Sequence, residues 1–403
     1  MGNCGLRAKE KNVFLGPRLR AAVIAGDTAE VDRLCQMVHS GPGGILDELE
    51  SESSTAEHAF FVDVKGQSAL HLAARLGHEE VVQILLNRGA SILHDYYGRQ
   101  PAHLAAENGH FSCLKLLLSS EAARKSPPKK DDKDKDKDKT REGETGSNKD
   151  NKDGIVDPNV RERVCGKTLL HLSAAGGHAN QVSLLLSFDG IRVNKQEMTG
   201  CTALHYACAE GHADCATLLL DHLETDITLK EFVFGQTALH KACSGGYSKC
   251  VELLLLRSPC IEFIDVADDE FGRTPLHWAA QGDSAEFLSC VNLLLCPELI
   301  PNPANTAIED VFGRTALIYA CMSGSLESVK LLLEAGSHPN HRDRDGTAAL
   351  LHAAQSNRHQ ILALLLEWPT VDRDVENLEG ETVWTMHHRD AETKRILQSY
   401  CLW

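Results

Sequence analysis

The chain has 403 residues, and its 57 Asp and Glu outnumber its 41 Lys and Arg, so its net charge is −16. This acidic balance disfavours nonspecific binding to nucleic acid. No apolar run approaches the roughly 18 residues that span a bilayer, and the N-terminus lacks an uninterrupted apolar core of signal-peptide length. We therefore expect a cytoplasmic protein that does not bind nucleic acid.

The first 17 residues, which open with "MGNCGLRAKEKN", are expected to be flexible and basic. Gly2 would accept myristate after removal of Met1, and Cys4 lies where palmitate often joins it. A single acyl chain binds a membrane marginally, so the basic residues or the second lipid would be needed. Leu6 departs from the pattern, which prefers Ser or Thr there. Gly2 and Cys4 are the lipidation candidates, and a frayed start is the alternative.

Residues 18–38, "RLRAAVIAGDTAEVDRLCQMV", predict a helix pair that caps the N-terminal side of a periodic region. An acidic, serine-rich insertion at residues 39–65 separates this pair from the first periodic unit. Two similar units cover residues 66–118, and the first reads "GQSALHLAARLGHEEVVQILL". Six more units cover residues 166–379, and a degenerate copy at residues 380–403 is expected to cap the C-terminal side.

The unit glycines lie 32 to 41 residues apart within uninterrupted runs. A fixed period near 33 marks stacked repeats, each of which buries its apolar face only against its neighbours. Each glycine supplies a positive-φ turn, and a Ser or Thr two residues later, such as Ser68, caps the first helix. The acidic residue three before many glycines can organise a tight turn; these residues are Asp63, Asp95, Glu197, Asp269, Asp310 and Asp343.

These units resemble the ankyrin repeat, whose signature is close to G-x-T-P-L-H-x-A-A-x-x-G-H followed by LLL. The resemblance covers most of residues 60–370. It implies an all-α solenoid of stacked helix–turn–helix units, with β-hairpin-like loops projecting as fingers beside a concave groove. It also implies that protein partners bind at the residues around each unit glycine and at the end of the first helix.

Residues 119–165 interrupt the units with a stretch rich in Lys and Asp, "KSPPKKDDKDKDKDKTREGETGSNKDNKD". Such a segment cannot offset its ordering entropy, so we expect disorder. A solvated loop that the fold tolerates is the simpler interpretation, and a regulatory tether is the alternative.

Seven of the 14 cysteines recur at two slots of the repeat, where Ala or Val stands in other units. No C-x-x-C pair is present, which argues against zinc as a ligand of these thiols. We expect reduced, small apolar fillers of the core at Cys113, Cys208, Cys215, Cys243, Cys250, Cys290 and Cys321.

No catalytic residue, cofactor or metal site is expected. One histidine recurs at the same slot of six units, which indicates a structural tie, because catalysis needs a distinctive constellation. These histidines are His71, His103, His171, His205, His240 and His277. The "GKT" at Gly166 lacks the upstream glycine of a phosphate loop, since that position is Arg161.

Aromatic and arginine side chains are enriched at binding hot spots, and several stand at the slots that the resemblance assigns to partners. Packing on the next finger is the alternative role for the aromatic ones. The partner-binding candidates are Arg75, Tyr96, Tyr97, Arg99, Glu107, Phe234, Gln236, Phe271, Arg273, Phe312 and Arg314.

We therefore expect a monomeric, non-catalytic scaffold or adaptor for protein partners, cytoplasmic or held at the cytoplasmic face of a membrane through its N-terminus. A regulatory subunit or inhibitor of a partner enzyme, such as a kinase or phosphatase, is the alternative. The sequence does not identify the partner, because only scattered surface positions of a repeat encode specificity.

Overall fold

Short helices joined by tight turns form the part of the chain that the structure, a computed structural model, describes. This part comprises residues 16–39, 63–90, 92–119, 157–257, 263–300, 302–386 and 390–400. The chain divides into residues 1–192, here unit 1, and residues 193–403, here unit 2. Gly2 and Cys4 lie outside the described residues, as does most of both insertions.

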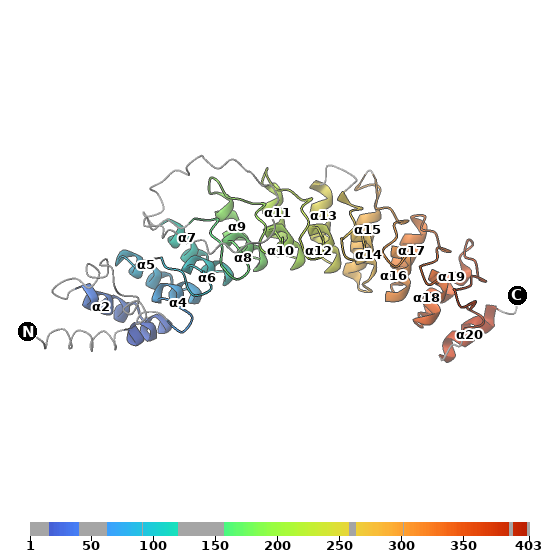
Figure 1. Cartoon of the computed structure of the whole chain (residues 1–403), viewed down its shortest axis with the longest axis horizontal. Helices are drawn as coiled ribbons and strands as arrows, with labels where there is room; N and C mark the ends of the chain where they lie inside the picture. The colour runs from blue at the N-terminus through green and yellow to red at the C-terminus, as the bar shows by residue number, and fades with distance from the viewer. Residues whose placement is uncertain are drawn as a thin grey trace, which may run out of the picture. The chain divides into compact units, whose positions relative to one another are not determined.

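In unit 1, the predicted N-terminal helix pair corresponds to a helical stretch at residues 16–25 and to α2. Helix α2 packs on α5, α4 packs on α6, and α6 packs on α8, while α5, α7 and α9 form a second row (Figure 1). The helices are α2 Thr28–His39, α4 Ala69–Leu76, α5 Glu79–Asn87, α6 Pro101–Glu107, α7 Phe111–Ser119, α8 Leu169–Ala175 and α9 Ala179–Leu186.

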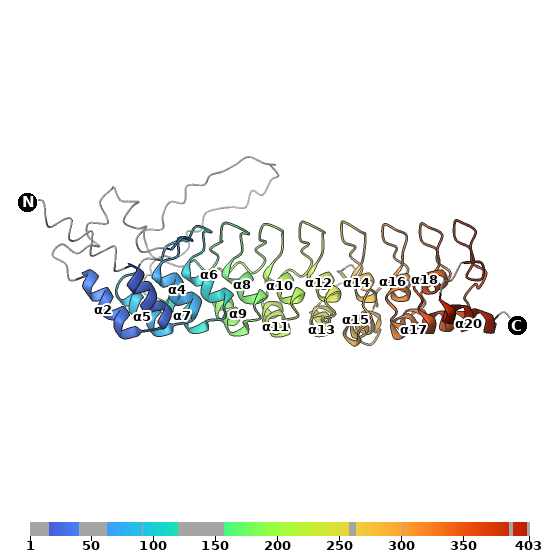
Figure 2. The ribbon, with the colours of Figure 1, turned by 90° about the horizontal axis from the view of Figure 1, so that it is seen from below.

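Unit 2 repeats the same plan in two layers. The first helices α10 Ala203–Ala209, α12 Ala238–Ser244, α14 Pro275–Ala280, α16 Ala316–Ser323 and α18 Ala349–Gln355 pack in sequence. The second layer holds α11 Ala213–Asp221, α13 Ser248–Arg257, α15 Ala285–Leu295, α17 Leu326–Glu334 and α19 His359–Glu367, and α20 Ala391–Tyr400 packs on α19. Within unit 2, the loops between repeats rise in a row from the first-helix layer (Figure 2).

Six of the eight first helices, all but α16 and α18, start at a cap that the repeat histidine completes. The backbone N–H of Thr237 donates to Nδ1 of His240, 3.1 Å away, and the Thr237 hydroxyl lies 2.9 Å from the same nitrogen. Nε2 therefore carries the proton and donates to the carbonyl of Arg273 in the next repeat, at 3.1 Å. His71, His205 and His277 make the corresponding bonds, which confirms the structural tie.

The seven repeat cysteines are all buried, as expected for small apolar fillers. Burial raises the pKa of the Cys321 thiol well above its ordinary value and that of Cys290 to about 12. The described cysteines form no disulfide. These side chains therefore contribute packing.

The second insertion ends earlier than its composition suggests. Residues 157–165, which we assigned to it, belong to the loop that leads into Gly166. The backbone N–H of Glu162 donates to the Lys167 carbonyl at 3.0 Å, and that of Arg163 donates to the Tyr97 carbonyl at 2.8 Å. These hydrogen bonds order a polar segment that has little apolar surface of its own.

Candidate functional site

The loop before a unit glycine is here called a finger, and in six repeats it is held by one buried carboxylate. Asp95 accepts the backbone N–H groups of Tyr97 and Arg99, and Asp310 accepts those of Phe312 and Arg314. We call such residues anchor acids; those buried in the structure are Asp95, Glu197, Glu231, Asp268, Asp310 and Asp343. In each case a tight turn gains an internal acceptor for its amides.

One residue assigned from sequence is corrected here. Asp269 was expected to organise its turn, but Asp268 accepts the N–H groups of Phe271 and Arg273. This finger has one residue more between its anchor acid and Gly272, which shifts the carboxylate by one position. Asp269 is exposed instead and receives Lys230 Nζ at 2.7 Å.

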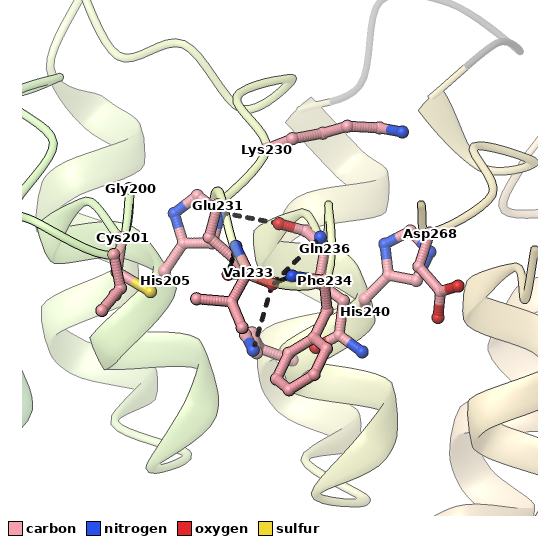
Figure 3. A network of polar contacts seen from close by, with 12 residues as sticks. Gly200, Cys201, His205, Lys230, Glu231, Val233, Phe234, Gln236, His240 and Asp268 are labelled. Carbon is pink, nitrogen blue, oxygen red and sulfur yellow. Dashed lines mark hydrogen bonds and ion pairs between the residues drawn. The ribbon is translucent and has the colours of Figure 1, made fainter. Parts of the chain in front are cut away.

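The finger before Gly235 shows how anchor acid and histidine cooperate (Figure 3). Glu231 accepts the N–H groups of Val233, Phe234 and Gln236. The carbonyl of Gln236 in turn accepts Nε2–H of His205 from the preceding repeat, at 3.2 Å. Burial lowers the pKa of His205 to about 4, so its ring is neutral at pH 7 and acts as a donor.

In unit 2, a side chain from each of four first helices reaches the anchor acid of its own repeat. Trp278 Nε1 donates to Asp268 at 2.9 Å, and the Tyr319 hydroxyl donates to Asp310 at 2.6 Å. His352 Nε2 lies 2.8 Å from Asp343, and Lys241 Nζ lies 3.9 Å from Glu231. Polar contacts therefore link these four first helices to the anchor acids at the bases of their fingers.

Arg273 joins two neighbouring repeats at the bases of their fingers. Its guanidinium lies 4.8 Å from the ring centres of Phe271 and Tyr319 and 5.2 Å from that of Trp278. It donates to the Tyr319 hydroxyl at 2.8 Å, and its Nε lies 3.5 Å from Asp310. With only 13% of its side chain exposed, Arg273 fixes the fingers rather than offering a charge to solvent.

Four of the six unit 2 fingers carry exposed apolar side chains. Phe232, Val233 and Phe234 stand on one finger, and Val311 and Phe312 stand on another, where Phe312 stacks on the half-buried Phe271 with ring centres 6.5 Å apart. Single exposed apolar residues are ordinary, but their repetition on four of the six unit 2 fingers makes this surface a candidate for interaction. We call this surface the finger ridge: Met198, Phe232, Val233, Phe234, Val311, Phe312 and Leu378.

Unit 1 places its candidates in a smaller group. Tyr96 and Tyr97 are exposed at a finger tip, and Arg99 lies 5.0 Å from the Tyr97 ring centre. Arg99 also pairs with Asp95 at 3.0 Å and with Glu107 at 3.7 Å. Arg75 bonds Gln67 at 3.3 Å. Hydrogen bonds from Arg99 hold the pKa of Asp95 below its ordinary value, although burial alone would raise it.

The structure thus separates the sequence candidates into two groups. Tyr96, Tyr97, Phe234 and Phe312 are exposed, whereas Arg99, Arg273 and Arg314 hold finger bases. Gln236 is only 6% exposed, so it offers a partner far less surface than the exposed candidates.

Five exposed tip residues were not among the sequence candidates: Met198, Phe232, Val233, Val311 and Leu378. Four of them, all except Phe232, stand two residues before a unit glycine, and this repeated position is the sequence feature that could have identified them.

Neither a metal-binding cluster nor a membrane-spanning helix is found within the described residues. No cluster of three or more His, Cys, Asp or Glu side chains there is arranged to hold a metal ion. No helix within the described ranges is both long and apolar enough to cross a bilayer.

Comparison with known proteins gives one family. The family model described as "Ankyrin repeats (3 copies)" matches residues 20–129, 148–231, 223–303 and 287–377. In the ankyrin repeat domain of human ASB11, solved by crystallography, 97% of that chain aligns with 58% of this one at 24% identity and a TM-score of 0.48.

Similarity to curated proteins is local. A segment of 87 residues is 34% identical to a putative ankyrin repeat protein of Acanthamoeba polyphaga mimivirus and spans 21% of each chain. Another of 73 residues is 37% identical to the human transient receptor potential cation channel subfamily A member 1, spanning 18% of this chain and 6% of that one. The matched part is thus about a fifth or less of either relative's length.

Proposed function

Because the chain belongs to the ankyrin repeat family, whose repeats are generally protein–protein interaction modules, we propose that it is a non-catalytic scaffold or adaptor. It binds protein partners through its fingers and the groove beside them. The observation that carries this proposal is the finger ridge, since the large apolar side chains on four of the six unit 2 fingers are stabilised by removal from water only when a partner covers them.

The ridge is separable from the elements that stabilise the fold. Phe232, Phe234 and Phe312 have exposed side chains, whereas the finger bases are held by backbone amides and anchor acids. Substituting the three phenylalanines by serine should therefore lower partner binding while changing the free energy of unfolding little. Phe271 is left intact in this variant, because it is half-buried and its ring lies against the Arg273 guanidinium.

The test is quantitative co-purification of proteins with the full chain, compared between wild type and the triple variant. Leu223→Ser is the matched control, since Leu223 is a fully exposed apolar residue in the turn after α11 and is not part of a finger. Proteins that bind the wild type and the control but not the triple variant would support the proposal. Equal recovery with all three proteins would contradict it.

The same experiment addresses regulation of a partner enzyme. If a kinase or phosphatase co-purifies in stoichiometric amount and the added chain changes its activity, the protein is a regulatory subunit or inhibitor. Turnover by the purified chain alone, lost on one point substitution, would instead contradict a non-catalytic role.

We further propose a cytoplasmic monomer held at a membrane surface through acylation of Gly2 and Cys4, which lie outside the described residues. The sequence "MGNCGLR" and the basic residues after it support this proposal. Incorporation of a myristate analogue into the wild type, lost in Gly2→Ala, is the expected result. Absence of label from the wild type would contradict it.

A further inference from the structure

We propose that the finger ridge of unit 2 binds a partner segment that combines large apolar side chains with Arg or Lys. This inference rests on the proposed function and specifies the chemical class of the partner. It is carried by three features of unit 2: the exposed apolar tips, the acidic side chains between them, and the net charge of the unit.

The acidic side chains stand beside the apolar ones on the two middle fingers. Asp269 and Glu270 directly precede Phe271, and Glu309 stands two residues before Val311. All three carboxylates are exposed, with 68% of the Asp269 side chain and 54% of the Glu309 side chain open to solvent. They differ from the anchor acids, which are buried and accept backbone N–H groups of their own turns.

Basic residues also lie near the ridge, but they do not reverse the sign of its charge. Lys230 pairs with Asp269, His341 lies 3.6 Å from Glu309, and the exposed Arg342 and Arg344 belong to the following finger. Arg273 and Arg314 are largely covered and matched by the buried Asp310 and Asp343. The middle of the ridge therefore presents apolar surface and carboxylates to a partner.

The charge of the whole unit acts in the same direction. Residues 193–403 hold 30 Asp and Glu against 15 Lys and Arg, whereas residues 1–192 hold 27 against 26. Nearly all of the chain's net negative charge thus belongs to the unit that carries the ridge, −15 of −16. A field of this sign attracts cationic segments, speeds their association and disfavours acidic ones.

The ridge rings are also suited to cations. Lys241 lies 5.7 Å from the Phe234 ring centre, and Arg314 lies 5.4 Å from that of Phe312. Both rings thus form cation–π contacts with the chain's own side chains. A partner segment with an apolar residue beside an arginine can cover such a ring and place its guanidinium near Asp269, Glu270 or Glu309.

The test uses the full chain and three pools of short fluorescent peptides, with binding followed by anisotropy. One pool has Phe, Leu or Val alternating with Arg or Lys. The second has Asp or Glu in place of the basic residues, and the third has Ser or Asn in place of the apolar ones. We expect the basic apolar pool to bind at least about tenfold more tightly than either other pool, and to weaken as salt is added.

Two variants and their controls separate the contributions. D269N/E270Q/E309Q should weaken the basic apolar pool by about tenfold and leave the acidic apolar pool unchanged or slightly tighter. The double variant E298Q/E334Q removes exposed carboxylates outside the fingers and should have little effect. F234S/F312S should weaken both apolar pools, whereas L223S should weaken neither.

The outcomes distinguish this inference from the function on which it rests. If the acidic apolar pool binds as well as the basic one, or if D269N/E270Q/E309Q binds like the wild type, the inferred partner class is wrong. The finger ridge then remains the proposed binding surface. If F234S/F312S binds every pool like L223S, the ridge itself fails, and with it the proposed function. If no pool binds, the basic apolar class is overturned, and co-purification alone decides the scaffold.

Discussion

Mild acid should destabilise the protein through its buried repeat histidines. Burial lowers the pKa of His103, His205 and His240 to about 4, against an ordinary value of 6.5. Between these values the unfolded chain binds a proton at each histidine and the folded chain does not. Stability must therefore fall as the pH falls from about 6.5 toward 4.

The magnitude follows from the size of the shift. Within this window, each such histidine lowers the free energy of unfolding by about 1.4 kcal/mol for every unit by which the pH falls. At about pH 5.5, the two in unit 2, His205 and His240, together remove roughly 3 kcal/mol, a large fraction of the ~5–15 kcal/mol that stabilises a typical domain. Protonation would also place a hydrogen on Nδ1, where the Thr202 and Thr237 N–H groups donate.

Carboxylates act in a separate window. Asp95 and Asp343 have folded pKa values below their ordinary 3.8, although burial alone would raise them. Their contribution is present above about pH 3.8 and is lost only as the pH falls below it. A loss of stability at about pH 5.5 is therefore assigned to histidine.

The assay is urea unfolding followed by circular dichroism at about pH 7.5 and about pH 5.5, with His240→Gln and the exposed-site control His338→Gln. His240→Gln should be less stable at about pH 7.5, but its stability should fall by about 1.4 kcal/mol less on acidification. Equal stability of the wild type at both pH values would refute the reasoning, as would a wild-type pH dependence in His240→Gln.

Three further changes test the finger bases and the core. Arg273→Ala should lower the free energy of unfolding by about 2–3 kcal/mol, and Arg273→Lys should lower it by about 1 kcal/mol. The lysine keeps the charge but not the planar group that lies among three rings. Equal urea midpoints for the wild type and both variants would be inconsistent with this. Gly200→Ala should cost about 3 kcal/mol, because a Cβ there would lie 2.6 Å from the Phe232 nitrogen, whereas Gly336→Ala, also at positive φ but with open space around it, should cost only about 1 kcal/mol. Alkylation followed by mass spectrometry should modify the half-buried Cys165 and Cys296 before the fully buried Cys208, Cys243 and Cys321; equal rates for both groups would show that the core opens readily.

The helical repeat was predictable because each unit restates the same local rules. The turn glycines, the Ser or Thr caps and the repeated histidine each act within a few residues, so they are visible in one copy and confirmed by the next. Positive φ at Gly66, Gly98 and Gly200 follows directly from this pattern. The burial of Cys208 and Cys250 follows from slots that hold Ala or Val elsewhere.

The candidate site was only partly predictable, because it depends on contacts between repeats. Arg273 and Arg314 resemble hot-spot residues in the sequence, yet both turn inward onto carboxylates of the next finger. Gln236 shares its column with them but is buried. The one-residue shift from Asp269 to Asp268 depends on how a longer turn closes, which the spacing of acids and glycines does not specify.

The way the fingers are held has a consequence for how this surface can evolve. Successive fingers are joined by main-chain bonds, such as Phe232 N–H to the Thr199 carbonyl and Val311 N–H to the Phe271 carbonyl. These bonds do not depend on the side chain two residues before the glycine, which is Met198, Val233, Val311 or Leu378 in four of the fingers. Mutations at this position can therefore change the partner while the scaffold persists, so that binding specificity can drift one finger at a time.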